Sequence, residues 1–333
     1  MELSDFLLLR KDLPVVDVRS EGEYAEGHIR GALNLPILNN EERKAVGTDY
    51  KQVGQQSAIM TGFRLIGPRL SGLIEDAQKI SDGRELLVHC WRGGMRSNYF
   101  CQFVGMARVK TQSLNGGYKT YRQKALESFK TPLKLKVIGG RTGSGKSEVL
   151  RALKAKGEQV IDLENLANHR GSAFGALMMP KQPTTEQFQN DLFEEIMKLD
   201  KDRTIWVEDE SLSIGRIYLP MDFWATMSKS PVVEINVDRD RRVERLVNEY
   251  GPSDKQEFLE AMVKITKRLG GQNFNAAKEK LMAGDMTGTI DILLTYYDKA
   301  YQYGLDNKKE RIISKVDWNG KDPADAIAQL GIS

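Results

Sequence analysis

The chain has 333 residues, with 49 Lys and Arg against 46 Asp and Glu, which gives a formal net charge of +3. This length is sufficient for two domains of roughly 100–200 residues each, and the near balance of charge excludes a protein that binds nucleic acid over its whole surface, so that any RNA contact needs a local basic patch. The two cysteines are too few for a disulfide framework or a zinc site, and the absence of a signal-peptide core or a long apolar run predicts a cytoplasmic protein that does not enter the membrane.

The first third alternates short apolar runs with glycine-rich turns, which is typical of an α/β domain. Residues 14–19 predict a buried strand, and 20–36 predict a short helix, a turn and an extended segment. Residues 39–62 are polar and predict an insertion across the surface, with no strand. Residues 63–80 carry apolar positions at near-helical spacing.

A cysteine loop, HCWRGGMRS, follows the apolar run at residues 86–88 and predicts a strand, a tight loop and a helix. Glycines let successive backbone N–H groups point inward, a helix N-terminus lies behind, and Arg92 and Arg96 add positive charge; all three favour a thiolate and a bound anion. Cys90 is therefore predicted to be a nucleophile, with Arg92 and Arg96 as its partners. The other interpretation is a half-buried cysteine in a basic turn.

Four segments resemble, in order, the landmarks of a rhodanese (sulfurtransferase) domain: residues 17–24, residues 27–32, the Cys90 loop and residues 116–118. This resemblance implies that Cys90 carries a transferable chalcogen as a persulfide. The loop departs from sulfur-carrying rhodaneses, because five residues separate Cys90 from Arg96. That spacing also matches the cysteine-phosphatase signature, and it predicts a loop that holds something larger than one sulfur atom.

A second motif begins where a predicted strand at residues 135–138 enters a complete G-x-x-x-x-G-K-S sequence with a predicted helix behind it. Backbone N–H groups of such a loop cradle phosphates, Lys146 neutralises terminal phosphate oxygens, and the Ser147 hydroxyl suits a Mg²⁺ ion. The predicted phosphate- or diphosphate-binding residues are Gly140, Arg141, Thr142, Gly143, Ser144, Gly145, Lys146 and Ser147.

Two further pairs of residues are candidates for the same site. His169 and Arg170 lie in a loop beyond a second predicted strand and are expected either to face the phosphates or to form a solvated turn. Glu208 and Asp209 end a buried strand, where P-loop proteins keep a carboxylate that supports Mg²⁺. The arginine-rich segment 239–245 resembles phosphate-sensing arginines of small P-loop kinases, and a salt-bridged helix face explains it equally well.

The predicted architecture is thus α/β, with a rhodanese-like parallel-sheet domain at residues 1–130 and a P-loop NTPase/kinase-like α/β domain at residues 131–333. The Thr131-Pro132 step is the expected boundary. The last part of the second domain, from about residue 250, is expected to be helical and to carry a basic surface. The sequence does not predict the oligomeric state, and a monomer is compatible with it.

The combination of the two motifs resembles the bacterial tRNA 2-selenouridine synthases over nearly the whole chain, with further matches at residues 46–54, 169–175 and 208–211. The resemblance implies an enzyme that transfers geranyl and selenium to tRNA, and converts 2-thiouridine at the wobble position to 2-selenouridine. It implies S-geranyl-2-thiouridine as the intermediate, geranyl diphosphate and selenophosphate as co-substrates, and a selenophosphate-producing enzyme as a partner.

The residues are chemically suited to that route, since alkylating a thiocarbonyl sulfur makes it expellable, and a P-loop with Lys146, Ser147 and Mg²⁺ can neutralise a departing diphosphate. Two alternatives stay open on the residues alone. One is a sulfurtransferase fused to an ATP-dependent small-molecule or nucleoside kinase. The other is a non-catalytic module that senses phosphate or a nucleotide.

Overall fold

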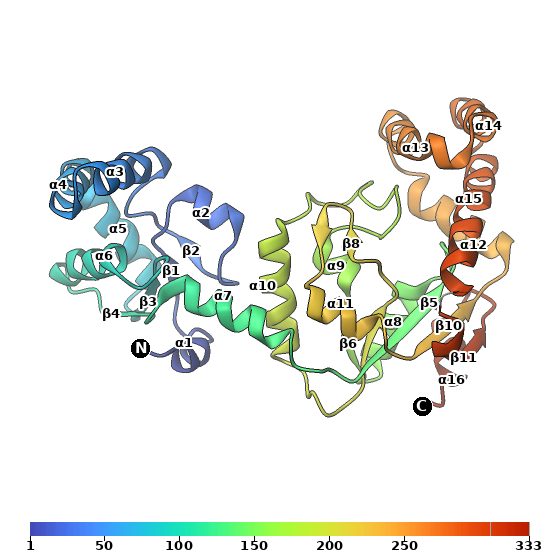
Figure 1. Ribbon diagram of the computed structural model, residues 1–333, viewed down its shortest axis with the longest axis horizontal. Helices are drawn as coiled ribbons and strands as arrows, with labels where there is room; N and C mark the ends of the chain where they lie inside the picture. Colours follow the sequence, from blue (N-terminus) through green and yellow to red (C-terminus); the bar gives the residue numbers. More distant parts are fainter. Residues whose placement is uncertain (307, 333) are drawn as a thin grey trace. The chain divides into compact units, whose positions relative to one another are not determined.

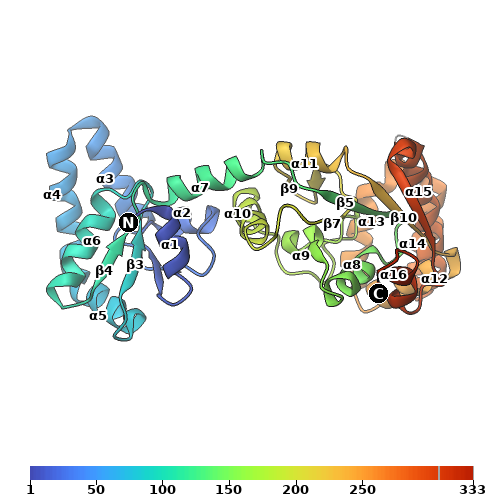
Figure 2. The ribbon, with the colours of Figure 1, turned by 90° about the horizontal axis from the view of Figure 1, so that it is seen from below.

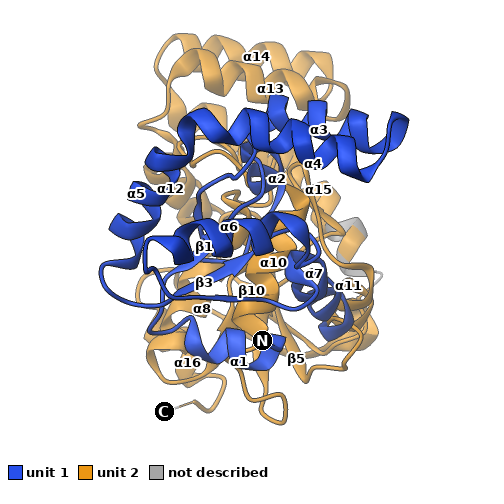
Figure 3. Ribbon diagram, turned by 90° about the vertical axis from the view of Figure 1, so that its left-hand side faces the viewer, with its two compact units in different colours: residues 1–128 blue, residues 129–333 orange. Residues whose placement is uncertain are grey.

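The computed structural model describes residues 1–306 and 308–332, except for the side chains at 302, 303, 305 and 306. The chain separates into two compact units, Met1–Ser128 and Phe129–Ser333, which Figure 3 shows in different colours. Each unit is built on its own parallel sheet, and each is described by itself below. No helix in the described ranges is both long and apolar enough to span a membrane.

The first unit contains a four-stranded sheet in which every neighbouring pair is parallel. The strand order is β2 (Leu33–Asn34), β1 (Val15–Asp17), β3 (Leu86–His89) and β4 (Thr111–Ser113). All four residues of β3 are buried, because helices cover both faces of the sheet. The candidate cysteine follows β3 directly and so lies at the carboxyl edge of the sheet, where ligands of open α/β sheets bind.

The helices of this unit divide between the two faces of the sheet (Figure 1). Val16 and Val88 pack with Leu73 and Phe100 on one face, and Phe6 of the first helix and Tyr118 approach the His89 ring on the other. The helices are α1 (Leu3–Leu9), α2 (Glu21–Glu26), α3 (Asn40–Gln52), α4 (Gln55–Ile66), α5 (Leu70–Ser81), α6 (Met95–Met106) and α7 (Gly117–Ser128), with a 3-10 turn η1 (Gly67–Arg69) before α5.

The polar segment predicted as a surface insertion forms the helix pair α3 and α4. A capping box starts α3, in which Asn39 and Glu42 each accept the backbone N–H of the other. None of the residues of α3 is buried, whereas α4 buries Ala58, Gly62 and Ile66. The segment therefore lacks a strand, as expected, but its helices were not predicted.

The second unit contains a five-stranded parallel sheet and a small antiparallel hairpin. The sheet order is β11 (Ile312–Asp317), β10 (Val232–Asn236), β5 (Leu135–Gly140), β7 (Ile205–Glu208) and β6 (Gln159–Ile161), and the hairpin joins β8 (Ser213–Ile214) and β9 (Ile217–Tyr218). Helices α8 (Lys146–Ala155) and α16 (Pro323–Ala328) cover one face, and α11 (Met221–Met227) covers the other (Figure 2). The P-loop strand β5 occupies the centre of the sheet, and the α/β architecture predicted from the sequence is confirmed.

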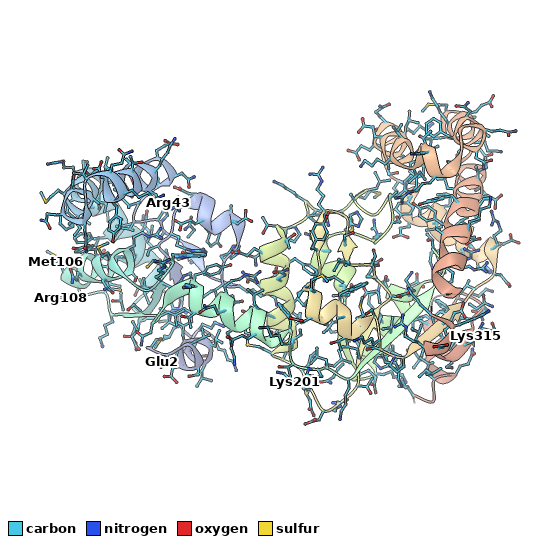
Figure 4. The ribbon with its side chains drawn as sticks, in the orientation of Figure 1. Glu2, Arg43, Met106, Arg108, Lys201 and Lys315 are labelled. Carbon is cyan, nitrogen blue, oxygen red and sulfur yellow. The ribbon has the colours of Figure 1, made fainter. Side chains whose placement is uncertain are left out.

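The remaining helices of this unit are α9 (Leu163–Ala167), α10 (Thr185–Ile196), α12 (Arg239–Tyr250), α13 (Lys255–Leu269), α14 (Gly271–Met282) and α15 (Met286–Asp306), with a 3-10 turn η2 (Lys309–Arg311) after α15. Helices α12 to α15 share a core with the loop that carries Phe174. The expected helical part from about residue 250 is present, but β11 was not predicted within it. This strand returns to the sheet edge, where Lys315 pairs with Glu234 of β10 at 3.1 Å (Figure 4).

Candidate functional site

The Cys90 loop is held rigidly between β3 and α6. The N–H of Tyr118 donates to the Cys90 carbonyl at 2.8 Å, and the N–H of Lys119 donates to the Trp91 carbonyl at 2.9 Å. Gly117 has a φ of +61°, and a Cβ at this position would collide with the Cys90 carbonyl oxygen. Residues 116–118, one of the segments that resemble a rhodanese domain, therefore hold the cysteine loop in place.

The environment of Cys90 favours its thiolate. Burial of this side chain, which is 3% exposed, raises the pKa. The Ser97 hydroxyl at 3.3 Å, the backbone N–H groups of Ser97 and Arg92, and the charge of Arg96 outweigh burial, so the pKa of Cys90 lies below its ordinary value. The predicted partners thus act in different ways: Arg92 through its backbone while its side chain is exposed, and Arg96 through its charge.

The Arg96 guanidinium, predicted to hold an anion, is engaged by a carboxylate. Its two terminal nitrogens donate to the two oxygens of Glu23 at 2.6 and 3.1 Å. Arg43 of α3 (Figure 4) also contacts Glu23, at 2.9 Å. Burial raises the pKa of Glu23, but Arg96 and Arg43 together lower it below its usual value, so the carboxylate stays ionised. An oxyanion that enters the loop must therefore share Arg96 with Glu23 or displace it.

A buried polar cluster lies on the other face of β1 and β3. Arg19 pairs with Asp17 at 2.6 Å, donates to the Gly27 carbonyl at 2.6 Å and stacks over the Tyr118 ring at 3.9 Å. Burial lowers the pKa of His89, which favours a neutral imidazole between Phe6 and Tyr118. This cluster supports Tyr118 and, through its N–H, the cysteine loop.

The P-loop joins β5 to α8 and opens into a cavity of about 1160 Å³. Gly143 and Gly145 have φ values of +80° and +78°, in the left-handed region of backbone conformation that glycine adopts readily and other residues rarely do. Lys146 donates to the Gly140 carbonyl at 3.3 Å, and six of the eight predicted P-loop residues line the cavity, with Arg141 and Ser144 as the exceptions. The cavity is larger than a diphosphate needs, so it has room for a second chemical group.

The structure places the predicted carboxylates Glu208 and Asp209 in different surroundings. Glu208 is fully buried and accepts the N–H groups of Leu163 and Glu164 at 3.1 and 3.4 Å, so it caps the start of α9. Asp209 lines the cavity but is neutralised by Lys308, whose ammonium lies 2.6 and 2.5 Å from its two oxygens. The strand ends in acids as expected, but these acids have structural and ion-pair partners.

Another acid, Glu164, contacts the predicted magnesium ligand Ser147, and Glu210 lies beside Glu164. The Ser147 hydroxyl donates to Glu164 at 3.0 Å. A Cβ built on Gly171 would lie 2.5 Å from Glu210 Oε1 and 3.0 Å from Glu164 Oε1, so the two carboxyl groups converge there. Burial and the Glu164 charge raise the pKa of Glu210 to about 8. The pair therefore holds a proton near neutral pH, and sequence reasoning missed both residues.

His169 and Arg170 lie in different environments. Arg170 lines the cavity, where it pairs with Glu249 at 2.6 Å and donates to the Leu177 carbonyl at 2.9 Å. His169 is buried outside the lining, and a Cβ on Gly175 would lie 2.8 Å from its ring. The His169 ring therefore packs against Gly175 and Gly215 and does not line the cavity.

The arginines of α12 brace the P-loop. Arg245 donates to the Gly143 carbonyl at 2.8 Å and pairs with Glu148 at 3.0 Å. Arg242 is buried, pairs with Asp298 at 2.7 Å and donates to the P-loop carbonyl of Thr142 at 3.3 Å. Arg242 and Arg245 thus form the ion pairs expected of a salt-bridged helix face.

Comparison with known proteins identifies the chain's relatives. The family model described as tRNA 2-selenouridine synthase AAA domain matches residues 133–322, and the rhodanese-like domain model matches residues 3–124. The first of these covers more than half of the chain. The chain belongs to the tRNA 2-selenouridine synthase family. The two matched regions contain the two motifs, the Cys90 loop in the rhodanese-like region and the P-loop in the other.

Two of its relatives match the chain over most of its length. The chain is 34% identical to the tRNA 2-selenouridine synthase of Sulfurovum sp. (strain NBC37-1), over 93% of the chain and 94% of the relative. It is 34% identical to that of Hydrogenovibrio crunogenus, over 94% of each. The solved N-terminal domain of a protein from Clostridium difficile 630, described as a putative ATP/GTP binding protein, is 37% identical to the chain. The match covers 38% of this chain and 98% of the solved domain, with a TM-score of 0.36.

Proposed function

We propose that this chain converts 2-thiouridine at the wobble position of tRNA to 2-selenouridine in two steps, through S-geranyl-2-thiouridine. The observation that carries the proposal is the presence of two chemically different sites in one member of this family. One is the Cys90 loop, which stabilises a thiolate. The other is a P-loop at a cavity larger than a diphosphate.

The first step is assigned to the P-loop cavity. The thiocarbonyl sulfur attacks the first carbon of geranyl diphosphate, the carbon–oxygen bond breaks, diphosphate leaves, and the base loses its ring N–H proton. Lys146 and the P-loop N–H groups neutralise the charge that develops on the diphosphate. Lys308, which lines the same cavity, is bound to Asp209 and adds little charge while that pair holds.

Residues beside the P-loop fit a Mg²⁺ ion that arrives with the diphosphate. Ser147 supplies a hydroxyl, and Glu164 and Glu210 supply converging carboxyl oxygens. No cluster of three or more His, Cys, Asp or Glu side chains suited to a metal occurs in the described ranges, so phosphate oxygens would complete the coordination. Bound there, the ion would stabilise the leaving diphosphate.

The second step is assigned to Cys90. Its thiolate attacks C2 of the geranylated base and expels geranyl thiolate; the selenium of selenophosphate then attacks the same carbon, cysteine leaves, and hydrolysis of the phosphorus–selenium bond completes the product. This order needs no oxidant or reductant, because every bond change is a displacement. It also requires selenophosphate, which another enzyme must supply.

The proposal is tested by nucleoside mass analysis of tRNA that carries 2-thiouridine. Geranyl diphosphate alone should yield S-geranyl-2-thiouridine, and later addition of selenophosphate should yield 2-selenouridine. Consumption of ATP with phosphorylation of a small acceptor, and no change in the tRNA, would contradict the proposal in favour of the kinase alternative.

A further inference from the structure

Trp91, which follows the nucleophile, forms a braced aromatic surface beside the Cys90 loop. Its ring lies 5.7 Å from the ring of Tyr118, tilted by 43°, and 6.0 Å from the Arg19 guanidinium. Tyr118 and Arg19 are fully buried, whereas Trp91 is partly exposed. The carbonyl of Trp91 is also held by the N–H of Lys119. The indole is therefore supported from within the unit and open to solvent elsewhere.

Two cationic residues are linked to Trp91 through the backbone. Arg92 and Lys119 are exposed, and neither side chain forms an ion pair with a described residue. Arg92 follows Trp91 in the chain, and Lys119 is tied to it through the backbone. A partly exposed aromatic ring with unpaired cations close by in the chain is a combination that recognises single-stranded RNA, because a base can stack on the ring while its phosphates meet the cations.

We infer that Trp91 is the stacking platform for an unstacked pyrimidine nucleobase presented to Cys90, with Arg92 and Lys119 contacting the phosphates on either side of that nucleoside. The inference rests on the proposed function for the identity of the base. Trp91 is then a positioning residue, since it orients the base while Cys90 performs the displacement. The rigid support from Tyr118 lowers the entropy lost when the base stacks.

The test is protection of Cys90 from iodoacetamide by a short single-stranded RNA with the anticodon-loop sequence and 2-thiouridine at the wobble position, using the full chain and mapping labelled peptides by mass. Wild type should be protected. Trp91→Ala should need roughly a five- to hundredfold higher RNA concentration for the same protection, the range typical of one lost stacking contact. Trp91→Phe should remain close to wild type.

Two controls separate stacking from other effects. Trp91→Leu keeps an apolar side chain without a π-face and should protect as poorly as Trp91→Ala; if it protects like wild type, the surface holds a hydrocarbon chain and the inference is overturned. Tyr50→Ala removes an exposed aromatic of the same unit and should change nothing. The alkylation rate without RNA should match wild type in each variant, which shows an intact loop.

The outcomes also separate this inference from the proposed function. Wild-type protection without any selenation would reject the proposed function and leave the stacking platform standing. Selenation without RNA protection of Cys90, or protection that is unchanged in Trp91→Ala, would reject the platform alone.

Discussion

Replacing Ser97 by alanine should raise the pKa of Cys90 by about one unit. The hydroxyl has one proton and two neighbours, the Cys90 sulfur at 3.3 Å and the Gly94 carbonyl at 3.0 Å. The Ser97 hydroxyl can donate to the thiolate only if it loses its hydrogen bond to the Gly94 carbonyl. A hydrogen bond to a charged acceptor contributes about 1.5–3 kcal/mol and a neutral one about 0.5–1.5 kcal/mol, so the net gain is about 1–1.5 kcal/mol. One pKa unit corresponds to about 1.4 kcal/mol.

The assay is the rate of Cys90 alkylation by iodoacetamide as a function of pH, since only the thiolate reacts. The midpoint of the Ser97→Ala curve should lie about one unit above that of wild type, and the rate well below the midpoint should fall about tenfold. Cys101 is an internal control, because burial raises its pKa and it lies outside this hydrogen bond. An unchanged midpoint of the Cys90 curve would show that the Ser97 hydroxyl does not stabilise the thiolate, and would refute this reasoning.

Three further predictions concern charge at the two sites. Lys146→Ala should abolish geranylation while the alkylation rate of Cys90 stays at the wild-type value; normal geranyl transfer in this variant would reject the diphosphate assignment. Glu23→Gln should increase protection of Cys90 by selenate or phosphate severalfold, because the carboxylate no longer competes for the loop arginine, whereas Glu21→Gln on the same helix should not; equal protection in both would show that the pair is only structural. The pKa of Glu210 of about 8 lies above the usual 4.5, so the folded chain retains a proton that the unfolded chain releases, and stability is lost as pH rises from about 5 to 8. Glu210→Gln should therefore have a higher Tm than wild type at pH 8.5 and a similar Tm near pH 4.5, as measured by calorimetry; parallel curves would exclude the raised pKa.

The parts of each site that lie in one contiguous motif could be predicted from the sequence. The Cys90 loop and the P-loop combine a strand, a glycine-containing turn and a helix, and local backbone geometry sets their form. The partners of these motifs come from elsewhere: Glu23 is 73 residues from the arginine that it binds. The sheet brings such residues together, and no local pattern specifies the pairing.

The acids beside the P-loop illustrate the same limit. Glu208 and Asp209 ended the expected strand, but strand direction and burial turned Glu208 towards the start of α9. Ser147 binds Glu164 of α9, and Glu210 reaches the same place because the segment after β7 meets α9 at Gly171. The edge strand β11 was missed for a related reason: it lies after a long helical region and only its pairing with β10 identifies it.

The most direct test of a two-site enzyme is a bypass experiment with tRNA that already carries S-geranyl-2-thiouridine. Given selenophosphate, Lys146→Ala should convert this tRNA to 2-selenouridine at close to the wild-type rate, because the step that needs the P-loop has been supplied. Cys90→Ala should leave the geranylated base unchanged. Undiminished selenation by Cys90→Ala, or failure of Lys146→Ala on the geranylated tRNA, would contradict the division of labour between the two sites.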